Sequence, residues 1–557
     1  MVIFFKKAAV LTAVLSALCL ASCVKVNREL GSDMLPVTQQ YDVLTFEIPL
    51  EEIGLRMVDG LSGFSSTRIT VGAIRDDLFG LTTRESAFSL VPALDTLDFG
   101  KDPVFKRFYL HMALDTISVA DASQTNILQN LNVYALSEPI DYTKTDTNSE
   151  IPYERVRISR GVPVINGRDS LKIEFTKEFG ERYLKIVQED LDTITNYSPK
   201  FPGIVLECDP PDGVGGRINM FELSCLSVES NNYYRNANEA VLVFSGVYDG
   251  VRKDTSFLFI PGEPTFYDEV KYLADNQKFY QYAFNHTGHE TKDWTGSAGD
   301  EIYIEGGGGL KPVVSASEMR EKLLAEISAH GDPQRAIISK ATIEFPFEAP
   351  SDYTLFDQYP SILSPTSRIE KEGEDGAKSY TFAALTDSGT STENQGNIDR
   401  SNLEYAPDVT HHLQEILRLE DLSTIHNYDV WFLNVHTETI AVASGNSAEN
   451  EYYRNLMYAQ YYNSLYGGGY GGYGGYGGYG YGGYGYGYGG YGYGGYGGYS
   501  NYYSLMMMQA MMQSSSTQTK TTSELDKDRY YRSVLNGPTS PHSRKPVLKG
   551  TYCLPRK

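Results

Sequence analysis

The chain has 557 residues, of which 41% are hydrophobic, and a formal net charge of -23 at pH 7. This length predicts two or three domains with hydrophobic cores of their own. Because so acidic a surface repels phosphate backbones, the charge excludes nucleic acid as an expected partner.

The N-terminus has the pattern of a lipoprotein signal peptide. A short basic region, Lys6 and Lys7, precedes the apolar run 8–18, which is shorter than the roughly 20 residues of a membrane-spanning helix. The sequence Leu-Ala-Ser-Cys then ends at Cys23 and matches a lipobox. We therefore predict that residues 1–22 are removed, and that Cys23 carries a lipid such as palmitate. The mature chain is then expected to be soluble apart from its lipid attachment to a membrane.

Residues 23–45 are expected to form a tether that becomes ordered at its end. Beyond it, apolar and polar residues alternate in short runs such as 67–74, 108–114 and 131–136. This period of two indicates strands with one buried face, and clusters of Pro, Gly, Asn and Asp separate them. The chain is therefore predicted to be mainly β, with antiparallel, jelly-roll-like β-sandwich domains.

A few short helices are expected to pack across the ends of the sandwiches. Residues 177–188 carry apolar residues at helical spacing, and Ser315 with Glu318 has the spacing of a capping box for a helix up to about residue 328. A third helix is expected to begin at Asp408. His411 and His412 lie on this helix and point to different faces, so we expect surface positions for them rather than joint metal binding.

A second block of strands begins near residue 203. Residues 203–208 and 218–225 are predicted to form one hairpin, and residues 240–248 and 255–260 another. We place a loose boundary near residue 200. The predicted regions are a first β-sandwich region at 46–200, a second at 201–465, an insertion at 466–523, and C-terminal strands at 524–557 that complete the second region.

Three cysteines remain in the mature chain besides Cys23, namely Cys208, Cys225 and Cys553. An exported protein meets an oxidising compartment, so Cys208 and Cys225 could form a disulfide. A hairpin that turns at residues 213–216 would instead place Cys208 opposite residues 219–222, which leaves free thiols as the alternative.

Residues 466–500 consist almost only of Gly and Tyr, and a Met-rich and Ser-rich stretch follows. Without aliphatic residues to form a core, the insertion 466–523 is predicted to be disordered. Strand-like patterns return at 531–537 and 545–552, so we expect a long loop rather than a tail. Two interpretations remain open: a tolerated loop expansion, or an adhesive loop whose tyrosines stack on sugars or aromatic groups.

The densest group of possible ligands comprises His286, His289 and Asp293. His-x-x-His with a carboxylate can hold a metal, but the helical arrangement of metalloproteases is absent, so hydrogen bonding within a loop is the alternative. Asp190 lies in a segment that partly resembles a calcium loop without its Gly or closing Glu; structural calcium is therefore conceivable but not indicated. No cofactor is predicted, and nearby Trp294 could serve as an exposed aromatic platform.

No catalytic set stands out. The chain contains no nucleophile elbow, and the glycine runs 213–216 and 306–309 lack the Lys-Ser/Thr of a phosphate-binding loop, so we interpret both as turns. Carboxylates are too abundant for one pair to be chosen.

Short motifs spread over nearly the whole mature chain are similar to those of a known family. They are the lipobox at Cys23, residues 30–36, Val71 and Gly72 with Phe79 and Gly80, residues 213–217, His286 with Asp293, Tyr303 with glycines 306–309, and residues 534–538 with the terminal strand. In these motifs the chain resembles a family of Bacteroidota outer-membrane lipoproteins known only as a domain of unknown function. The resemblance implies an outer-membrane location and a β architecture, and it supplies no catalytic residues. The Gly/Tyr tract departs from the family.

These observations favour a non-enzymatic, lipid-anchored outer-membrane protein of binding or structural type. It would be an accessory component of an envelope complex with a protein partner. The alternative is a surface glycan-binding protein or a polysaccharide hydrolase with paired carboxylates. Residues 24–29 contain no acidic run, which in these bacteria accompanies surface display, so the leaflet stays open between the cell surface and the periplasm.

Overall fold

The computed structural model describes residues 40–58, 61, 63–65, 68–93, 96–140, 147–223, 226–229, 232–235, 238–264, 279–280, 283–372, 378–389, 394–442, 492–493 and 518–556. The predicted signal peptide, the lipidation site Cys23 and most of the predicted insertion 466–523 lie outside these ranges.

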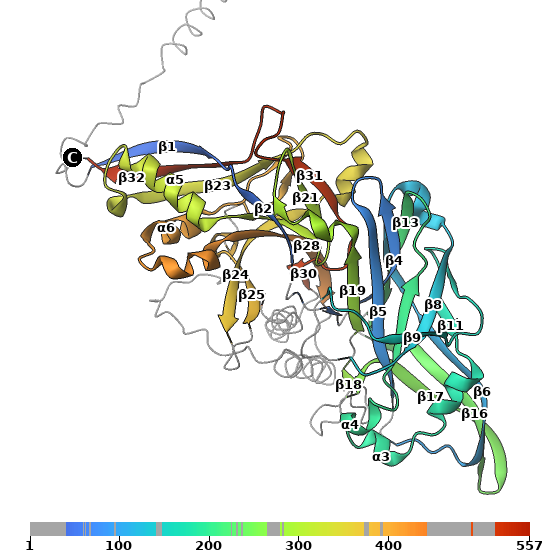
Figure 1. Cartoon of the computed structure of the whole chain (residues 1–557). Coiled ribbons are helices and arrows are strands. Elements are labelled where there is room, and N and C mark those ends of the chain that lie inside the picture. Colours follow the sequence, from blue (N-terminus) through green and yellow to red (C-terminus); the bar gives the residue numbers. More distant parts are fainter. Residues whose placement is uncertain are drawn as a thin grey trace, which may run out of the picture.

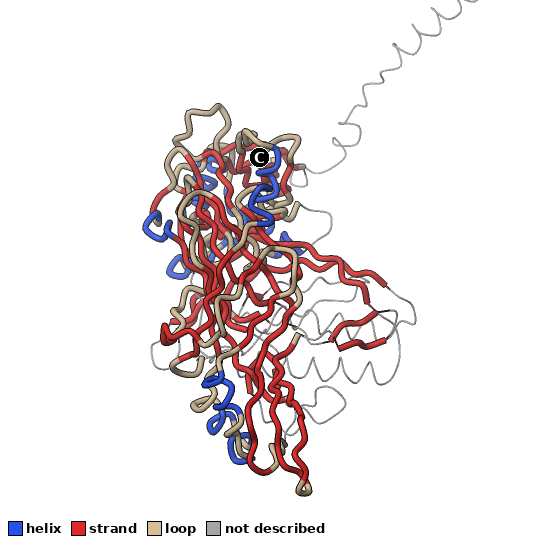
Figure 2. Tube along the Cα trace, turned by 90° about the vertical axis from the view of Figure 1, so that its right-hand side faces the viewer, coloured by secondary structure: helices blue, strands red, loops and turns tan. Residues whose placement is uncertain are grey.

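The protein is mainly β, and all pairings between its described strands are antiparallel (Figures 1 and 2). This confirms the predicted fold class, since alternating apolar residues bury one face of each strand. The strands form two bodies, each with its own hydrophobic core. The first body comprises residues 64–289, and the second comprises residues 41–57 together with 296–555.

The first body contains a 15-stranded sheet and a separate two-stranded hairpin, β14 with β15. Its core draws on strands β4–β6, β8, β11–β13, β16 and β17 and on three short helices. The strands are β3 (Phe64–Ser65), β4 (Arg68–Asp76), β5 (Gly80–Pro92), β6 (Lys101–Met112), β7 (Leu114–Val119), β8 (Gln129–Leu136), β9 (Tyr153–Arg157), β10 (Val164–Ile165), β11 (Leu171–Glu174), β12 (Ile204–Cys208), β13 (Gly215–Glu222), β14 (Leu226–Glu229), β15 (Asn232–Arg235), β16 (Glu239–Tyr248), β17 (Val251–Pro264), β18 (Phe279–Tyr280) and β19 (Ala283–His289). The helices are η3 (Ala122–Asn126), α2 (Lys177–Tyr183), α3 (Gln188–Leu191) and α4 (Ile194–Tyr197).

The second body places its core between a five-stranded and an eight-stranded sheet, with helices α5 and α6 contributing. The strands are β1 (Tyr41–Pro49), β2 (Ile53–Met57), β20 (Gly296–Ser297), β21 (Glu301–Glu305), β22 (Leu310–Val314), β23 (Ile337–Pro346), β24 (Ile362–Glu372), β25 (Lys378–Ala384), β26 (Ile398–Asp399), β27 (Glu404–Tyr405), β28 (Val430–Val442), β29 (Gly492–Tyr493), β30 (Gln518–Leu525), β31 (Arg532–Asn536) and β32 (Val547–Pro555). The helices are α5 (Ala316–Ser328), η5 (Pro333–Arg335), η6 (Tyr353–Gln358), η7 (Thr386–Gly389), α6 (Thr410–Arg418) and η8 (Leu422–Tyr428), while η4 (Glu290–Trp294) joins the bodies.

The predicted helices are present with shifted ends. The hydroxyl of Ser315 accepts the N–H of Glu318 and begins α5, which is one half of the predicted capping box. The Glu318 carboxylate instead accepts the backbone N–H of Glu51 at 3.1 Å. The expected helix 177–188 is shorter and ends at Tyr183. In α6, His412 is only 4% exposed, so its predicted surface position is wrong: it lies on the buried face with Leu413 and Ile416.

Sheet pairing does not follow the boundary predicted near residue 200. Strands β12 and β17, which follow that residue, pair with β5, which precedes it. The first strands β1 and β2 pair with β32 and β22 of the second body. The chain thus enters the second body, leaves it for the first and returns near residue 290. Antiparallel partners far apart in sequence produce this arrangement.

The hairpin predicted from residues 203–208 and 218–225 is wrong. Strand β12 lies between β5 and β8, whereas β13 lies between β4 and β7. Both segments are strands, but buried neighbours on both sides, rather than the turn between them, determine their pairing. The second predicted hairpin, β16 with β17, is confirmed.

The strands flanking the Gly/Tyr tract pair with each other. Val435–Val442 of β28 runs antiparallel to β30, so residues 443–517 are an insertion between two paired strands. Strand β30 begins at Gln518, inside the predicted insertion. The chain then returns to the second body: β31 pairs with β21, and β32 lies between β1 and β23.

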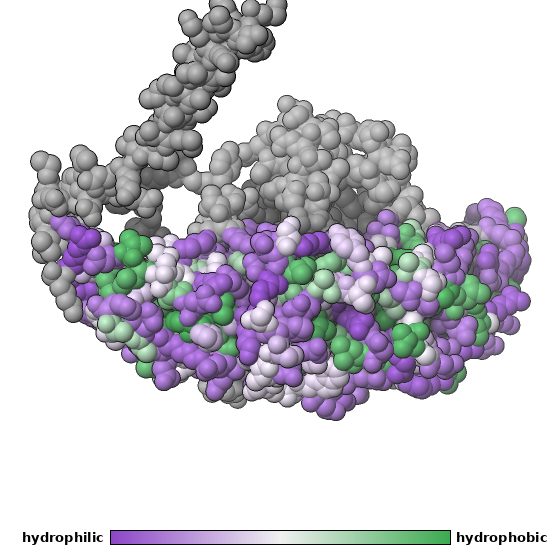
Figure 3. Space-filling view, turned by 90° about the horizontal axis from the view of Figure 1, so that it is seen from above, coloured by the Kyte–Doolittle hydropathy of each residue, from purple (hydrophilic) through white to green (hydrophobic). Residues whose placement is uncertain are grey.

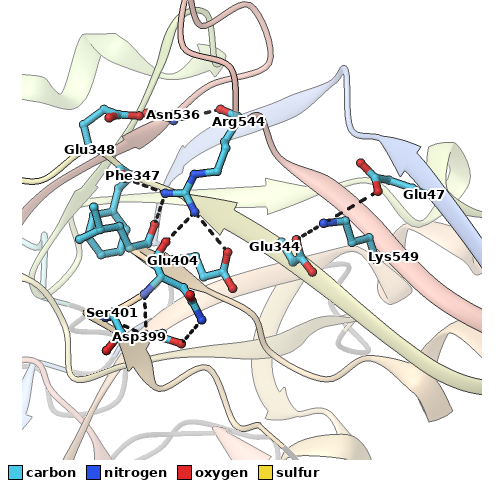
Figure 4. A network of polar contacts seen from close by, with 12 residues as sticks. Glu47, Glu344, Phe347, Glu348, Asp399, Ser401, Glu404, Asn536, Arg544 and Lys549 are labelled. Carbon is cyan, nitrogen blue, oxygen red and sulfur yellow. Dashed lines mark hydrogen bonds and ion pairs between the residues drawn. The ribbon is translucent and has the colours of Figure 1, made fainter.

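A polar network fixes this returning C-terminal segment (Figure 4). The Nη2 of Arg544 donates to the carbonyl oxygens of Leu403 at 3.0 Å and Phe347 at 3.2 Å. Further along, Nζ of Lys549 lies 2.7 Å from Oε2 of Glu344 on β23. These contacts hold β32 in its place between β1 and β23.

Candidate functional site

A buried carboxylate marks the place where the two bodies meet. Glu305 ends β21 in the second body, and its side chain is 2% exposed. Its Oε1 lies 3.2 Å from Nδ1 of His289, which ends β19 in the first body. Its Oε2 accepts hydrogen bonds from the hydroxyl of Thr291 and the backbone N–H of Leu310. We call Glu305, these partners, Lys311 and Arg84 the Glu305 centre.

The hydrogen bonds keep Glu305 ionised. Burial alone would raise the pKa of Glu305, but the hydrogen bonds from His289, Thr291 and Leu310 stabilise the carboxylate and hold that pKa below its usual range. Burial also lowers the pKa of His289, so the imidazole is neutral at neutral pH. A neutral imidazole can still donate its Nδ1–H to Glu305. Hydrogen-bond donors therefore stabilise the carboxylate more than an ion pair does.

Lys311 fills the glycine loop 306–309. Its Nζ donates to the carbonyl oxygen of Glu305 at 2.5 Å and to those of Gly307 and Gly309 at 3.2 Å each. Burial lowers the pKa of Lys311 to about 7. Three carbonyl acceptors need three N–H donors, which favours the ammonium form. Because carbonyl groups rather than N–H groups surround this side chain, the loop differs from a phosphate cradle and fits its interpretation as a turn.

Close packing explains glycine at two positions of this loop. A Cβ on Gly306 would lie 2.4 Å from the carbonyl oxygen of Arg529. Gly307 has a φ of 55°, and a Cβ there would lie 3.2 Å from Nη2 of Arg84. The loop can therefore contact both the first body and the segment that follows β30.

Arg84 brings a second buried cation to the centre from β5. Its side chain is 1% exposed, and its Nε and Nη2 have no hydrogen-bond partner within the described part of the chain. Burial lowers the pKa of Arg84 to about 10, although Asp528, Glu305 and Asp526 raise it. These carboxylates offset the charge at a distance, since Coulomb interactions persist in a buried site.

The segment 526–531, directly after β30, connects the centre to both bodies. The backbone N–H of Asp526 donates to the carbonyl oxygen of Asn434 on β28 at 3.0 Å. In the other direction, Nζ of Lys527 donates to the carbonyl oxygen of Phe64 at 2.5 Å. The backbone N–H of Tyr530 donates to the hydroxyl of Ser118 at 3.2 Å. The end of the Gly/Tyr insertion is thus attached to the body junction.

The weak metal-ligand candidates His286, His289 and Asp293 form no group of ligands in the described structure. His289 is bonded to Glu305, while Asp293 is exposed on η4. His286 is mostly buried on the same strand as His289, and burial lowers its pKa. No group of three or more His, Cys, Asp or Glu side chains that could hold a metal occurs among the described residues. In this region, hydrogen bonding fits the geometry better than coordination.

Cys208 is buried, and burial raises the pKa of its thiol to about 12. Its proposed partner Cys225 lies outside the described residues, so the disulfide stays a prediction. The weak calcium candidate Asp190 instead accepts the N–H of Val187 at 3.0 Å and pairs with Lys200. One carboxylate oxygen therefore caps the start of α3, and the other holds Lys200, which follows α4.

Sequence reasoning missed Arg84, Glu305 and Lys311. Each lies in a strand pattern in which a charged residue normally indicates the solvent face. The neighbouring sequence therefore does not reveal that these residues are buried. The glycines after Glu305 were the available signal, because four in a row indicate close backbone contact.

Trp294 belongs to an aromatic cluster on the surface of the junction. Its ring centroid is 4.9 Å from that of Tyr303 on β21 and 6.2 Å from that of Phe79 in the first body. Trp294 is 37% exposed, whereas Phe79 is buried. The predicted platform is therefore partly accessible, and the cluster also links the two bodies.

Comparison with protein-family models, with curated proteins and with solved structures gives no match. Within the described residues, no helix combines the length and the apolar character needed to span a membrane. The assignment of a function therefore depends on the sequence motifs and the geometry above.

Proposed function

We propose that this chain is a lipid-anchored outer-membrane protein that works by binding or structural support. It would serve as an accessory component of an envelope complex, with a protein partner. The observation that carries this proposal is the lipobox ending at Cys23, which precedes a folded body beginning at Tyr41. An anchor at one end and a multi-strand body behind it suit a tethered scaffold.

The position of the Gly/Tyr tract supports a role in contact with a partner. The tract lies within residues 443–517, between the paired strands β28 and β30. Both of its ends are thus held by the second body, and tyrosines can stack on aromatic groups or sugars of a neighbour. Segment 526–531 ties the same insertion to the Glu305 centre.

The Glu305 centre itself supports a structural role. Its carboxylate and the Lys311 ammonium bond to protein groups, and both side chains are 2% exposed. Polar groups arranged in this way fix the geometry of a junction. A hydrolase would instead direct paired carboxylates into an accessible cleft.

Affinity purification of the full-length chain in mild detergent tests the proposal. We compare the natural sequence with Cys23→Ala and with a variant in which residues 466–500 are replaced by Gly-Ser of equal length. The natural chain should take up an alkyne-labelled palmitate and co-purify with a defined envelope protein. Cys23→Ala should lose the label, and the tract variant should keep the label but lose the partner. A labelled chain that stays monomeric under crosslinking contradicts the proposed complex.

Protease treatment of intact cells tests which leaflet of the outer membrane carries the protein. Cleavage in the Gly/Tyr tract of intact cells indicates surface display, and protection that ends on permeabilisation indicates the periplasmic leaflet. A cytoplasmic control protein must remain uncut in both samples.

The exposed edge of Trp294 favours a second candidate function, glycan binding. Sugar rings stack on aromatic faces, and charged side chains beside such a face can bond their hydroxyls. Here Arg532 lies 3.0 Å from Asp77, next to the Phe79 ring of the cluster. A glycan array with the natural chain and with Trp294→Ala tests this candidate: a signal lost only in the variant supports it, and identical signals contradict it.

A further inference from the structure

One end of the second body has an apolar patch on its outer sheet face. In the antiparallel register, Val43 of β1 and Ile337 of β23 both lie opposite Cys553 of β32, and Tyr41 lies opposite Pro555. Directly opposite residues share a face of a sheet, so these five side chains lie together. We call them the β1 patch.

The patch faces away from the core. The residues that alternate with it, Leu44, Ile338 and Tyr552, pack into the hydrophobic core of the second body. By contrast, Tyr41, Val43 and Ile337 are 46%, 66% and 44% exposed. Viewed from above, the face of the molecule is mostly hydrophilic, and hydrophobic residues are scattered over it, some of them near this end (Figure 3).

The patch lies where the predicted lipid anchor joins the body. Strand β1 begins at Tyr41, and residues 24–40 reach at most about 60 Å from Cys23 when fully extended. The first body, including the β16–β17 hairpin, projects from the other end of the molecule (Figure 1). An anchored chain therefore keeps the patch at a high effective concentration near the bilayer.

We propose that the β1 patch rests on the lipid surface and orients the anchored protein, with the first body directed away from the membrane. This inference rests on the proposed lipidation of Cys23. Five residues are far fewer than the roughly 20–30 residues per side of a stable protein interface. A tethered contact with lipid needs much less area, and tyrosine with aliphatic side chains suits the headgroup boundary.

The flanking residues fit a contact at headgroup level. Arg556 pairs with Asp42 at 2.6 Å beside the patch, and both side chains are half exposed. Next along the sheet, Thr45, Thr551, Lys340 and neighbouring residues line a shallow hollow of about 590 Å³. The face thus changes from apolar to polar over two or three residues along the strands.

Fluorescence quenching by brominated lipid tests the orientation. The lipidated full-length protein is placed in phosphatidylcholine vesicles with bromine on the upper acyl chain. Tryptophan is introduced by Val43→Trp in the patch, or by Val251→Trp as a matched control. Val251 is an exposed valine, 57% accessible, at the far hairpin. The fluorescence of the natural tryptophans is measured in the unsubstituted protein and subtracted.

Because interfacial apolar groups insert about 5–10 Å, quenching of Val43→Trp should be at least about twofold stronger than that of Val251→Trp. Adding Ile337→Asp to Val43→Trp should remove most of this difference. Equal quenching at both positions in protein whose lipid is verified by mass overturns the orientation alone. Absence of the lipid overturns both the inference and the proposed anchor.

Discussion

At the scale of single residues, burial decides what a charged group does in this protein. Glu305, His289 and Lys311 are ordinary ionisable residues, yet the junction removes them from water and gives each specific hydrogen-bond partners. Leaving such a buried partner unpaired costs more than an average hydrogen bond contributes. Single substitutions in the Glu305 centre should therefore have large effects.

Glu305→Ala should lower the free energy of unfolding by at least about 3 kcal/mol. It leaves the donors of His289, Thr291 and Leu310 without an acceptor, and each such buried loss costs about 1–3 kcal/mol. Urea unfolding followed by the fluorescence of Trp294, in proteins that also carry Trp431→Phe, measures the change at the junction. Glu301→Ala, at an exposed position on the same strand, is the control and should stay within about 0.5 kcal/mol. Equal losses in both variants would contradict a special role for Glu305.

His412 should make the protein sensitive to mild acid. Burial lowers the pKa of His412 from 6.5 to about 4, so the unfolded chain binds more protons than the folded one between these values. The contribution of neutral His412 to the free energy of unfolding is complete above pH 6.5. It falls by about 3 kcal/mol in all as the pH drops from 6.5 towards 4. His412→Gln should flatten this part of the pH profile of unfolding, whereas exposed His411→Gln should not. The same slope in both variants would contradict the assignment.

At the scale of elements, the sequence indicated strands better than their partners. Alternating residues reveal the buried face of strands such as β6 and β8, because that pattern is local. Pairing is non-local, so β12 and β13 were joined into a hairpin that does not exist. For the same reason, the sequence could not reveal that β1 belongs to the second body, where it pairs with the C-terminal strand β32. In the Glu305 centre only Arg84 of β5 comes from a distant part of the sequence, whereas His289, Thr291, Glu305 and Lys311 lie within residues 289–311. The centre was missed because nothing in the local pattern indicates that these polar residues are buried together.

The insertion between β28 and β30 should be dispensable for folding. Since these strands pair directly, replacing residues 446–514 by a short Asn-Gly turn removes loop-closure entropy, worth about 0.6 kcal/mol for each halving of the loop. The replacement also removes the two-residue strand β29 from the sheet edge at β25, which offsets part of this gain. The free energy of unfolding should stay the same or rise by about 2 kcal/mol. Chemical denaturation of the lipid-free variant measures this. A Gly-Ser tract of natural length is the control for sequence, and a marked loss of stability in the short variant contradicts the loop assignment.

At the scale of the whole molecule, the two bodies are coupled through side chains rather than through one continuous sheet. The first body is inserted in the sequence of the second, and the segment 526–531 reaches across between them. Arg532 on β31 pairs with Asp76 and Asp77 of the first body at 3.0 Å. The Trp294 cluster adds aromatic contacts at the same junction. The bodies should consequently unfold together as long as these contacts remain.

The two tryptophans provide separate reporters of this coupling. Trp294 reports the junction, because it packs on Tyr303, and Trp431 reports the second body, where it is 6% exposed. In single-tryptophan proteins made by Trp294→Phe or Trp431→Phe, both reporters should give the same urea midpoint, as expected for one cooperative transition. In a Glu305→Ala background the Trp294 reporter should move to lower urea than the Trp431 reporter. The junction then opens first, since Glu305 bonds across it while Trp431 keeps its own packing. Coincident midpoints in that background would place the weakest contact elsewhere, whereas separate midpoints already in the natural protein would contradict coupling of the bodies.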